Sequence, residues 1–244
     1  MRDADRDVLA FAAAHHLVLS EQVAALLGID EDTPREPLAR LQAAGLIRRT
    51  RTLVSDPGAY QITSAGLAAI ASELPPPRLD PSRHRHDIGT AWVWLMATKG
   101  GNFGPVEHVL SEREMRAHDT ARSPVGLNPE PPTATPNTTK PTDPSFGVRP
   151  GGAEAPRSTR LHYPDLLLIT SAGRVPIELE LSRPRGERLS GIMSGYAAQP
   201  NLRGVLYMTD DQRVTRIVET TAARLGIAPL IHLQRIKLQA VELV

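Results

Sequence analysis

Two short aliphatic runs joined by a turn sequence constrain the fold of this chain more than any other feature. Residues 163–170 and 175–181 are rich in Leu, Ile and Val, and Ala172-Gly173 lies between them. Such runs, bounded by Pro and joined through Gly, predict a β-hairpin. With Ala172-Gly173 as the two turn residues, Asp165 lies directly opposite Glu180.

This pairing gathers three acidic side chains on one face of the hairpin. Glu178 is diagonally adjacent to Asp165, whereas the aliphatic residues of the second strand point to the other face. Like charges opposite one another destabilise a sheet, so three carboxylates gathered there need a compensating cation. Mg²⁺ or Mn²⁺ with oxygen ligands is the simplest such cation. We therefore expect a metal site formed by Asp165, Glu178 and Glu180.

A second interpretation places the acids on the solvated face of an edge hairpin. Pro176 favours it, because Pro inside a strand is typical of an edge position. A three-residue turn would also shift the register and move Asp165 to the opposite face. The residues of the hairpin alone leave both interpretations open.

Composition limits the classes of protein to which the chain can belong. Its 244 residues suffice for one or two domains with a sizeable core. The absence of cysteine excludes disulfides and thiolate zinc sites, and it indicates a cytoplasmic protein. The longest apolar run, Ala91–Ala97, is too short to span a bilayer, so we expect no membrane association. With a formal net charge of +1, binding to nucleic acid would require local basic patches.

Residues 1–75 have the pattern of a winged helix-turn-helix domain. Three helical segments start near Asp5, Glu21 and Thr33-Pro34, and two strands and a last helix capped by Thr63 follow. In this motif the second helix enters the major groove of double-stranded DNA, and the wing lies near phosphates. The residues expected to contact DNA are Arg35, Arg40 and Gln42 on that helix and Arg48, Arg49 and Arg51 on the wing. Use of the domain for protein contacts or dimerisation is the alternative, favoured by the acidic stretch 30–32.

After a polyproline linker at 75–77, residues 84–244 predict a second domain of mixed α/β (α+β) class. Its expected order is a helix, three strands, a helix, a strand, a helix and a strand. Residues 118–160 contain many prolines and few aliphatic residues, so we expect a disordered insertion there. Ser111-Glu112-Arg113-Glu114 has the form of a capping box, which makes Glu114 a helix cap rather than a ligand.

The second domain resembles the PD-(D/E)XK nuclease fold. The resemblance rests on Tyr163-Pro164-Asp165 on one strand and Ile177-Glu178-Leu179-Glu180 on the next. With the winged helix and the segment His84–Asp87 that opens the domain, the whole chain is similar to the replication-relaxation family of actinobacterial plasmids and integrative elements.

This resemblance implies a DNA-binding protein of a mobile element that acts in plasmid replication or mobilisation. It implies that the protein is a Mg²⁺-dependent endonuclease or nickase, with Asp165 and Glu178 as ligands and Arg183 near the scissile phosphate. Glu180 stands where the nuclease pattern has a lysine, so a non-catalytic regulator with a degenerate nuclease fold is the alternative. Replication or transfer machinery is the expected protein partner, and the sequence leaves open whether the chain forms a homodimer.

Four further residues lie near the acids. For His86 and Asp87 two roles are open, lining the cleft from the first helix of the domain or capping that helix. His162 is next to the acidic strand and could bind phosphate, but we expect it to be a surface histidine. Tyr196 lies on the apolar face of its helix, and we expect its ring in the core and its hydroxyl group at the surface.

Overall fold

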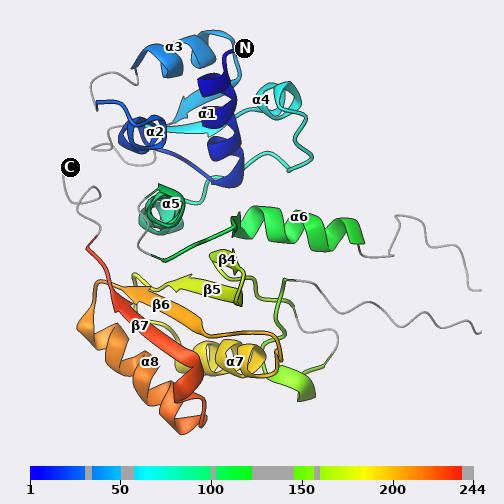
Figure 1. Cartoon of the computed structure of the whole chain (residues 1–244), viewed down its shortest axis with the longest axis vertical. Coiled ribbons are helices and arrows are strands. Elements are labelled where there is room, and N and C mark those ends of the chain that lie inside the picture. Colours follow the sequence, from blue (N-terminus) through cyan, green and yellow to red (C-terminus); the bar gives the residue numbers. More distant parts are fainter. Residues whose placement is uncertain (31–34, 51–57, 100–102, 123–145, 157–159, 238–244) are drawn as a thin grey trace, which may run out of the picture.

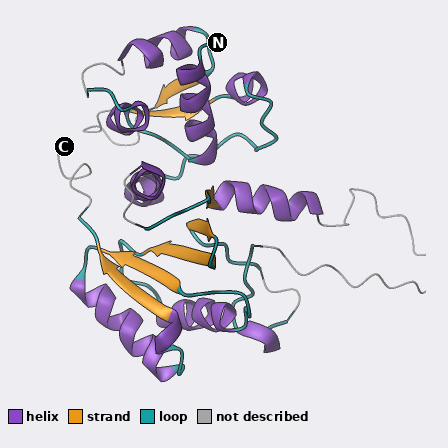
Figure 2. Cartoon of the chain, in the orientation of Figure 1, coloured by secondary structure: helices purple, strands orange, loops and turns teal. Residues whose placement is uncertain are grey.

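The computed structural model describes residues 1–30, 35–50, 58–99, 103–122, 146–156 and 160–237 of the chain. These residues form two lobes, a mainly helical N-terminal lobe and a larger lobe built around a five-stranded sheet, which we call the sheet lobe (Figures 1 and 2). Within the described residues, no helix combines the length and apolar character needed to cross a bilayer.

The N-terminal lobe contains four helices and a two-stranded antiparallel sheet, in the order expected from the sequence. Its elements are α1 (Asp3–Ala14), α2 (Ser20–Leu27), α3 (Arg35–Ala43), β1 (Ile47–Thr50), β2 (Ala59–Ile62) and α4 (Ser64–Ala69). The expected cap at Thr63 is confirmed, because its side chain accepts a hydrogen bond from the Gly66 N–H.

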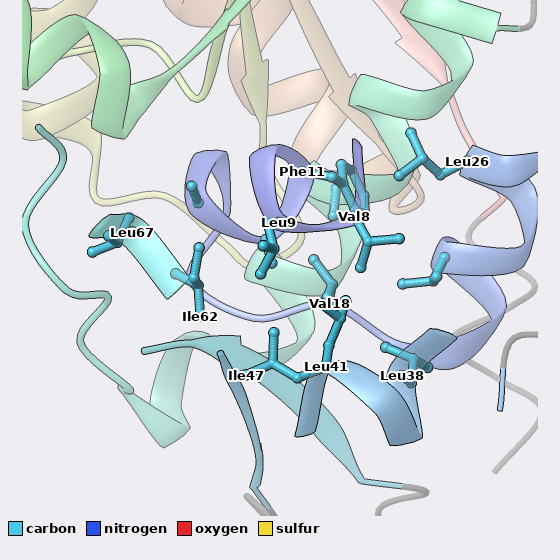
Figure 3. Close-up of a cluster of buried hydrophobic side chains, with 14 of the residues drawn as sticks. Val8, Leu9, Phe11, Val18, Leu26, Leu38, Leu41, Ile47, Ile62 and Leu67 are labelled. Carbon is cyan, nitrogen blue, oxygen red and sulfur yellow. The ribbon is translucent and has the colours of Figure 1, made fainter. Parts of the chain in front are cut away.

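The helices of this lobe enclose an apolar core, and a smaller cluster of Leu17, Leu19 and Ala59 packs with Ile88 of the following helix. Figure 3 shows side chains of α1, α2, α3, α4 and both strands meeting in the larger core, among them Leu9, Val18, Leu41 and Ile62. Each of these four side chains is almost fully buried. The apolar faces predicted from helical spacing therefore converge as expected.

Helix α5 (His84–Lys99) lies between the two lobes and packs against both (Figure 1). Ala91 and Leu95 belong to the core of the N-terminal lobe, whereas Val93 and Ala97 belong to a core of the sheet lobe. A buried hydrogen bond of 2.8 Å, from the Gln22 side-chain amide to the carbonyl oxygen of Ile88, adds to this contact. The lobes are thus joined by shared apolar packing as well as by the chain.

The sheet lobe is a mixed sheet with helices on both faces. Its strand order is β3-β4-β5-β6-β7, with β3, β4 and β5 antiparallel and β5, β6 and β7 parallel. Helix α5 covers one face, and α7 and α8 cover the other (Figure 1). The elements after α5 are β3 (His108–Ser111), α6 (Glu112–Arg122), β4 (Leu166–Thr170), β5 (Gly173–Leu179), α7 (Gly186–Ala197), β6 (Val205–Thr209), α8 (Gln212–Arg224) and β7 (Ile231–Arg235), with short 3₁₀ turns at Pro81–Arg83, Gly152–Glu154 and Ala228–Leu230.

The predicted order of three successive strands was wrong, because α6 lies between the first and the second. The capping box that starts α6 is confirmed: Glu114 accepts a hydrogen bond of 2.7 Å from the Ser111 N–H. Of the residues that α6 contributes to the apolar clusters, Met115 is the fully buried one, so the helix contains few apolar residues from which it could be predicted.

The hairpin is present, but its turn differs from the predicted one by one residue. Thr170 pairs with Gly173, so the turn residues are Ser171-Ala172, and Gly173 takes a φ of 129° that suits glycine. Leu166 pairs with Ile177, which brings Asp165 into line with Glu178 and not with Glu180. Moving the turn by one residue changes the pairing partner of each β4 residue by two positions along β5. Because side chains alternate between faces with a period of two, the three acids keep the same face.

The edge interpretation of the hairpin was wrong, because β5 lies between β4 and β6. Pro176 is tolerated in this central strand because pairing with β6 begins only at Ile177.

Part of the predicted insertion at 118–160 is folded. Residues 118–122 complete α6, and Val148 is buried against α7 and forms an isolated β-bridge with His162. Residues 123–145 and 157–159 lie outside the described residues.

Replacing Leu95 with Ala should lower the free energy of unfolding by about 2–5 kcal/mol, because it leaves a cavity in the core that α5 shares with the N-terminal lobe. Urea denaturation followed by circular dichroism should show one transition, shifted as a whole, because α5 belongs to both lobes. Lys99→Ala, an exposed change in the same helix, is the control and should change stability by less than about 0.5 kcal/mol. Two transitions, of which only one moves, would show that the lobes unfold independently.

Candidate functional site

The three predicted acids, Asp165, Glu178 and Glu180, line one cleft at the ends of β4 and β5. The cleft has a volume of about 540 Å³. Its other charged or titratable lining residues are Arg83, His86, Glu112, Arg116, Arg160, His162, Tyr163 and Arg188. The three acids identified from the sequence therefore share one cleft, in which Glu112 is a further acid that was not predicted, and we call this feature the acidic cleft.

Asp165 immediately precedes β4 and is held by groups from two other elements. One carboxylate oxygen accepts a hydrogen bond of 2.8 Å from the Leu179 N–H, and the Nε2 atom of His86 lies 3.1 Å from the same oxygen. Arg83 is 4.0 Å from the other oxygen. Burial acts to raise the pKa of Asp165, but the charge and hydrogen bond of His86 outweigh it, so the pKa is lowered.

His86 lies in the first turn of α5 and is the cation that pairs with Asp165. Burial opposes protonation of its ring, but the charge and hydrogen bond of Asp165 outweigh burial and raise the pKa of His86 to about 10. At neutral pH the two residues form an imidazolium–carboxylate pair. Of the two alternatives for His86, lining the cleft is confirmed.

Glu178 is almost fully buried in β5 and is held by two side chains. One of its oxygens lies 2.7 Å from the Nε2 atom of His162, and the hydroxyl group of Tyr196 on α7 donates a hydrogen bond to the same oxygen. Burial acts to lower the pKa of His162, but the negative charge of Glu178 outweighs it and raises the pKa. The predictions of a surface His162 and of a surface hydroxyl on Tyr196 were both wrong, because both groups turn inward to satisfy a buried carboxylate.

Glu180 follows the end of β5 and is in a different electrostatic state from the other two acids. Burial, together with the charges of Glu178 and Asp165, raises the pKa of Glu180 to about 7. Near neutral pH a large share of Glu180 is therefore protonated. Its side chain can then donate a hydrogen bond as well as accept one.

These contacts test whether the acids fit the predicted Mg²⁺ or Mn²⁺ ion. His86 is the compensating cation for Asp165, and His162 and Tyr196 hold one oxygen of Glu178, so part of each carboxylate is already engaged by protein groups. Across the part of the chain that the structure describes, no three His, Asp or Glu side chains are grouped so that they could hold a metal ion. The acids have the right chemistry for a hard cation, but their arrangement here does not fit one.

The predicted phosphate contact, Arg183, is exposed and does not line the acidic cleft. It lines a neighbouring hollow of about 320 Å³ together with Glu180 and Arg185. Arg188 in the first turn of α7 lines both hollows and is the nearer cation to the acids. Sequence reasoning missed Arg188, although its place beside Leu189 on the inner face of α7 was a usable signal.

The residues predicted to bind DNA are placed in different ways. Gln42 at the end of α3 and Arg48 and Arg49 on β1 are exposed. Arg40 instead forms an ion pair with Asp5 on α1. The hydrogen bond from Arg40 lowers the pKa of Asp5, and this effect is larger than the opposing effect of burial. Arg40 therefore fixes α3 against α1. Arg51 and the side chain of Arg35 lie outside the described residues.

Comparison of the chain with models of known protein families and with curated proteins finds no match.

Replacing His86 with Gln should flatten the fall in stability between pH 6.5 and 10. A histidine with a raised pKa in the folded state contributes stability that is fully present below the unfolded-state pKa of about 6.5, and this stability is lost as the pH rises through the folded-state pKa of about 10. Urea denaturation at a series of pH values measures this slope. His232→Gln, at an exposed position on β7, is the control and should keep the slope of the unmodified protein. An unchanged slope in His86→Gln would contradict the ion pair with Asp165.

Proposed function

We propose that this protein is a DNA-binding regulator or accessory factor of a mobile element, and that its sheet lobe is a nuclease-like scaffold without catalytic activity. The observation that carries DNA binding is the surface formed by α3 and β1. The two elements contact one another. Gln42 on α3 and Arg48 and Arg49 on β1 are all exposed. A polar residue at a helix end beside two exposed arginines suits a helix directed at a DNA groove with the strand near phosphates.

Each exposed residue has a distinct role in this proposal. Arg48 and Arg49 contact phosphates, for which the planar guanidinium is suited. Arg48 also receives support from Gln61, whose side-chain oxygen accepts a hydrogen bond of 3.0 Å from it. Gln42 is an exposed side chain on α3 that is able to contact a base edge. Arg40, held by Asp5, contributes to the position of the helix instead.

We propose that the sheet lobe is not catalytic because its acids already have partners within the protein. Asp165 is ion-paired with His86, one oxygen of Glu178 is engaged by His162 and Tyr196, and Glu180 replaces the lysine of the nuclease pattern. The resemblance to the replication-relaxation family supports the mobile-element role, with replication or transfer machinery as the protein partner.

A second candidate function is metal-dependent DNA cleavage. The observation that favours it is that Asp165, Glu178 and Glu180 all line one cleft that also contains arginines. For this function, Mg²⁺ or Mn²⁺ would have to draw the carboxylates away from His86 and His162. Arg188 would then lie close enough to the acids to contact a phosphate group.

Replacing both Arg48 and Arg49 with Ala should weaken binding of duplex DNA about tenfold at low salt and make its salt dependence shallower. The slope of log K against log salt concentration should become less negative by about 0.9 for each phosphate contact that is lost. Fluorescence anisotropy with labelled duplex DNA measures both quantities.

The matched control is Arg213→Ala with Arg216→Ala, which removes the same charge from exposed positions on α8, in the sheet lobe. This variant should bind duplex DNA as the unmodified protein does. Equal weakening by both pairs would mean that the charge of the whole molecule, and not the surface of α3 and β1, governs binding.

Incubation of supercoiled plasmid with the protein and Mg²⁺ or Mn²⁺ should give no nicking above that of an Asp165→Asn protein, because the acids are already engaged by protein groups. Agarose gel electrophoresis distinguishes the supercoiled, nicked and linear forms. Nicking that requires the metal and disappears in Asp165→Asn and Glu178→Gln proteins would instead establish the second candidate function.

A further inference from the structure

A second charged hollow lies beside the acidic cleft, between α6 and the segment that follows α4. It has a volume of about 980 Å³. Among the described residues that line it, five are arginines and two are glutamates: Arg78, Arg83, Arg113, Arg116 and Arg160 against Glu73 and Glu112. We call it the arginine groove, and its lining has an excess of positive charge.

The guanidinium of Arg113 is a cation in this groove that has no anionic hydrogen-bond partner among the described residues. Its side chain is buried, and within the described residues its guanidinium donates hydrogen bonds to two neutral oxygens, the carbonyls of Ala13 and Pro75. Burial lowers the pKa of Arg113, which reflects the cost of keeping this cation away from water. A buried cation held by neutral groups favours a nearby anion.

Glu112 and Glu114 flank Arg113 in sequence, and their charges oppose the lowering of its pKa by burial, but both carboxylates are hydrogen-bonded to other groups. Glu114 accepts hydrogen bonds from the N–H and hydroxyl groups of Ser111. Glu112 accepts a hydrogen bond of 2.8 Å from Arg116, with which it forms an ion pair, and lies 3.7 Å from Arg83. The guanidinium of Arg116 also lies 4.5 Å from the ring centre of Tyr163, which fixes its orientation. Among the described residues, the five arginines that line the groove therefore outnumber its two glutamates, and Arg113 has no carboxylate hydrogen-bond partner.

The arginine groove opens into the acidic cleft. Arg83, Glu112, Arg116 and Arg160 line both hollows. A ligand that followed the arginines would reach Asp165 and Glu178, which are engaged by His86 and His162.

We propose that the arginine groove binds the phosphate backbone of a single nucleic-acid strand and directs it to the acidic cleft. This inference rests on the proposed function, since it assumes that the protein binds nucleic acid. Duplex DNA has a persistence length of about 50 nm, so it cannot bend into a hollow of this size. A single strand is flexible enough to enter the groove and narrow enough to place successive phosphates beside recessed arginines.

The lining also defines how such a strand is bound. No Phe, Trp or Tyr belongs to the described lining of the arginine groove. The large aromatic side chains on which single-strand binding proteins usually stack bases are therefore missing from the described lining, and His16 and His118 are its aromatic rings. Binding depends on phosphate charge, so it is independent of sequence and falls steeply as salt is added.

The test measures binding of a labelled oligothymidylate of about 12 nucleotides, within the usual site size of single-strand binding modules. Replacing both Arg78 and Arg160 with Ala removes two exposed cations of the groove. We expect about tenfold weaker binding at low salt and a salt slope that is less negative by about 0.7 per lost contact. The pair Arg213→Ala and Arg216→Ala on α8 is the control and should leave binding unchanged.

The same proteins are compared on duplex DNA so that the two proposals can fail separately. Loss of oligothymidylate binding with duplex binding retained supports the groove, and the reverse pattern in the protein lacking Arg48 and Arg49 supports the surface of α3 and β1. If the protein lacking Arg78 and Arg160 binds oligothymidylate as tightly as the unmodified protein, the groove proposal is wrong. If oligothymidylate binds through the groove while duplex DNA does not bind at all, the groove proposal stands and the proposed function must be revised.

Discussion

In an α-helix, side chains four residues apart share a face, and those two residues apart lie on opposite faces. Helix α5 uses this geometry to place Ala91 and Leu95 in one lobe and Val93 and Ala97 in the other. Packing on two sides leaves the helix little freedom to rotate or slide. Its first turn carries His86, so the same packing that joins the lobes also fixes the position of this histidine beside Asp165.

The acidic cleft follows from that constraint and from the cost of burying charge. A buried carboxylate without a partner loses its hydration and gains nothing in return. Each of the two most strongly held acids is therefore bound by donors from other elements, Asp165 by α5 and the β5 backbone, Glu178 by His162 and α7. Among the described residues, no donor is hydrogen-bonded to the Glu180 carboxylate in this way. Burial and the neighbouring acids therefore raise its pKa to about 7.

Much of the fold could be predicted from the sequence because it depends on local patterns. The helices of the N-terminal lobe, the cap at Thr63 and the capping box at Ser111 have signatures within a few residues of one another. The shared face of the three acids was predicted correctly despite a wrong turn. A register error of two residues changes which residues pair, but it leaves every side chain on the same face.

The partners of the acids could not be predicted in the same way. His86 lies 79 residues before Asp165, and no local spacing connects them. Gathered carboxylates need a compensating cation, and local spacing suggests a metal because a histidine from a distant element leaves no local signal. Arg188 differs, because it directly precedes Leu189, a residue expected on the inner face of α7, so its position near the acids had a local signal.

The pairing of the acids also determines what can approach the cleft. Unpaired carboxylates in a hollow of low dielectric would repel a phosphate backbone strongly. With Asp165 paired with His86 and Glu178 held by His162, the lining of the cleft also contains four arginines, Arg83, Arg116, Arg160 and Arg188. Histidine pairing and metal binding both reduce this repulsion. A metal could in addition activate water for cleavage, whereas in this structure the histidines hold the acids in place.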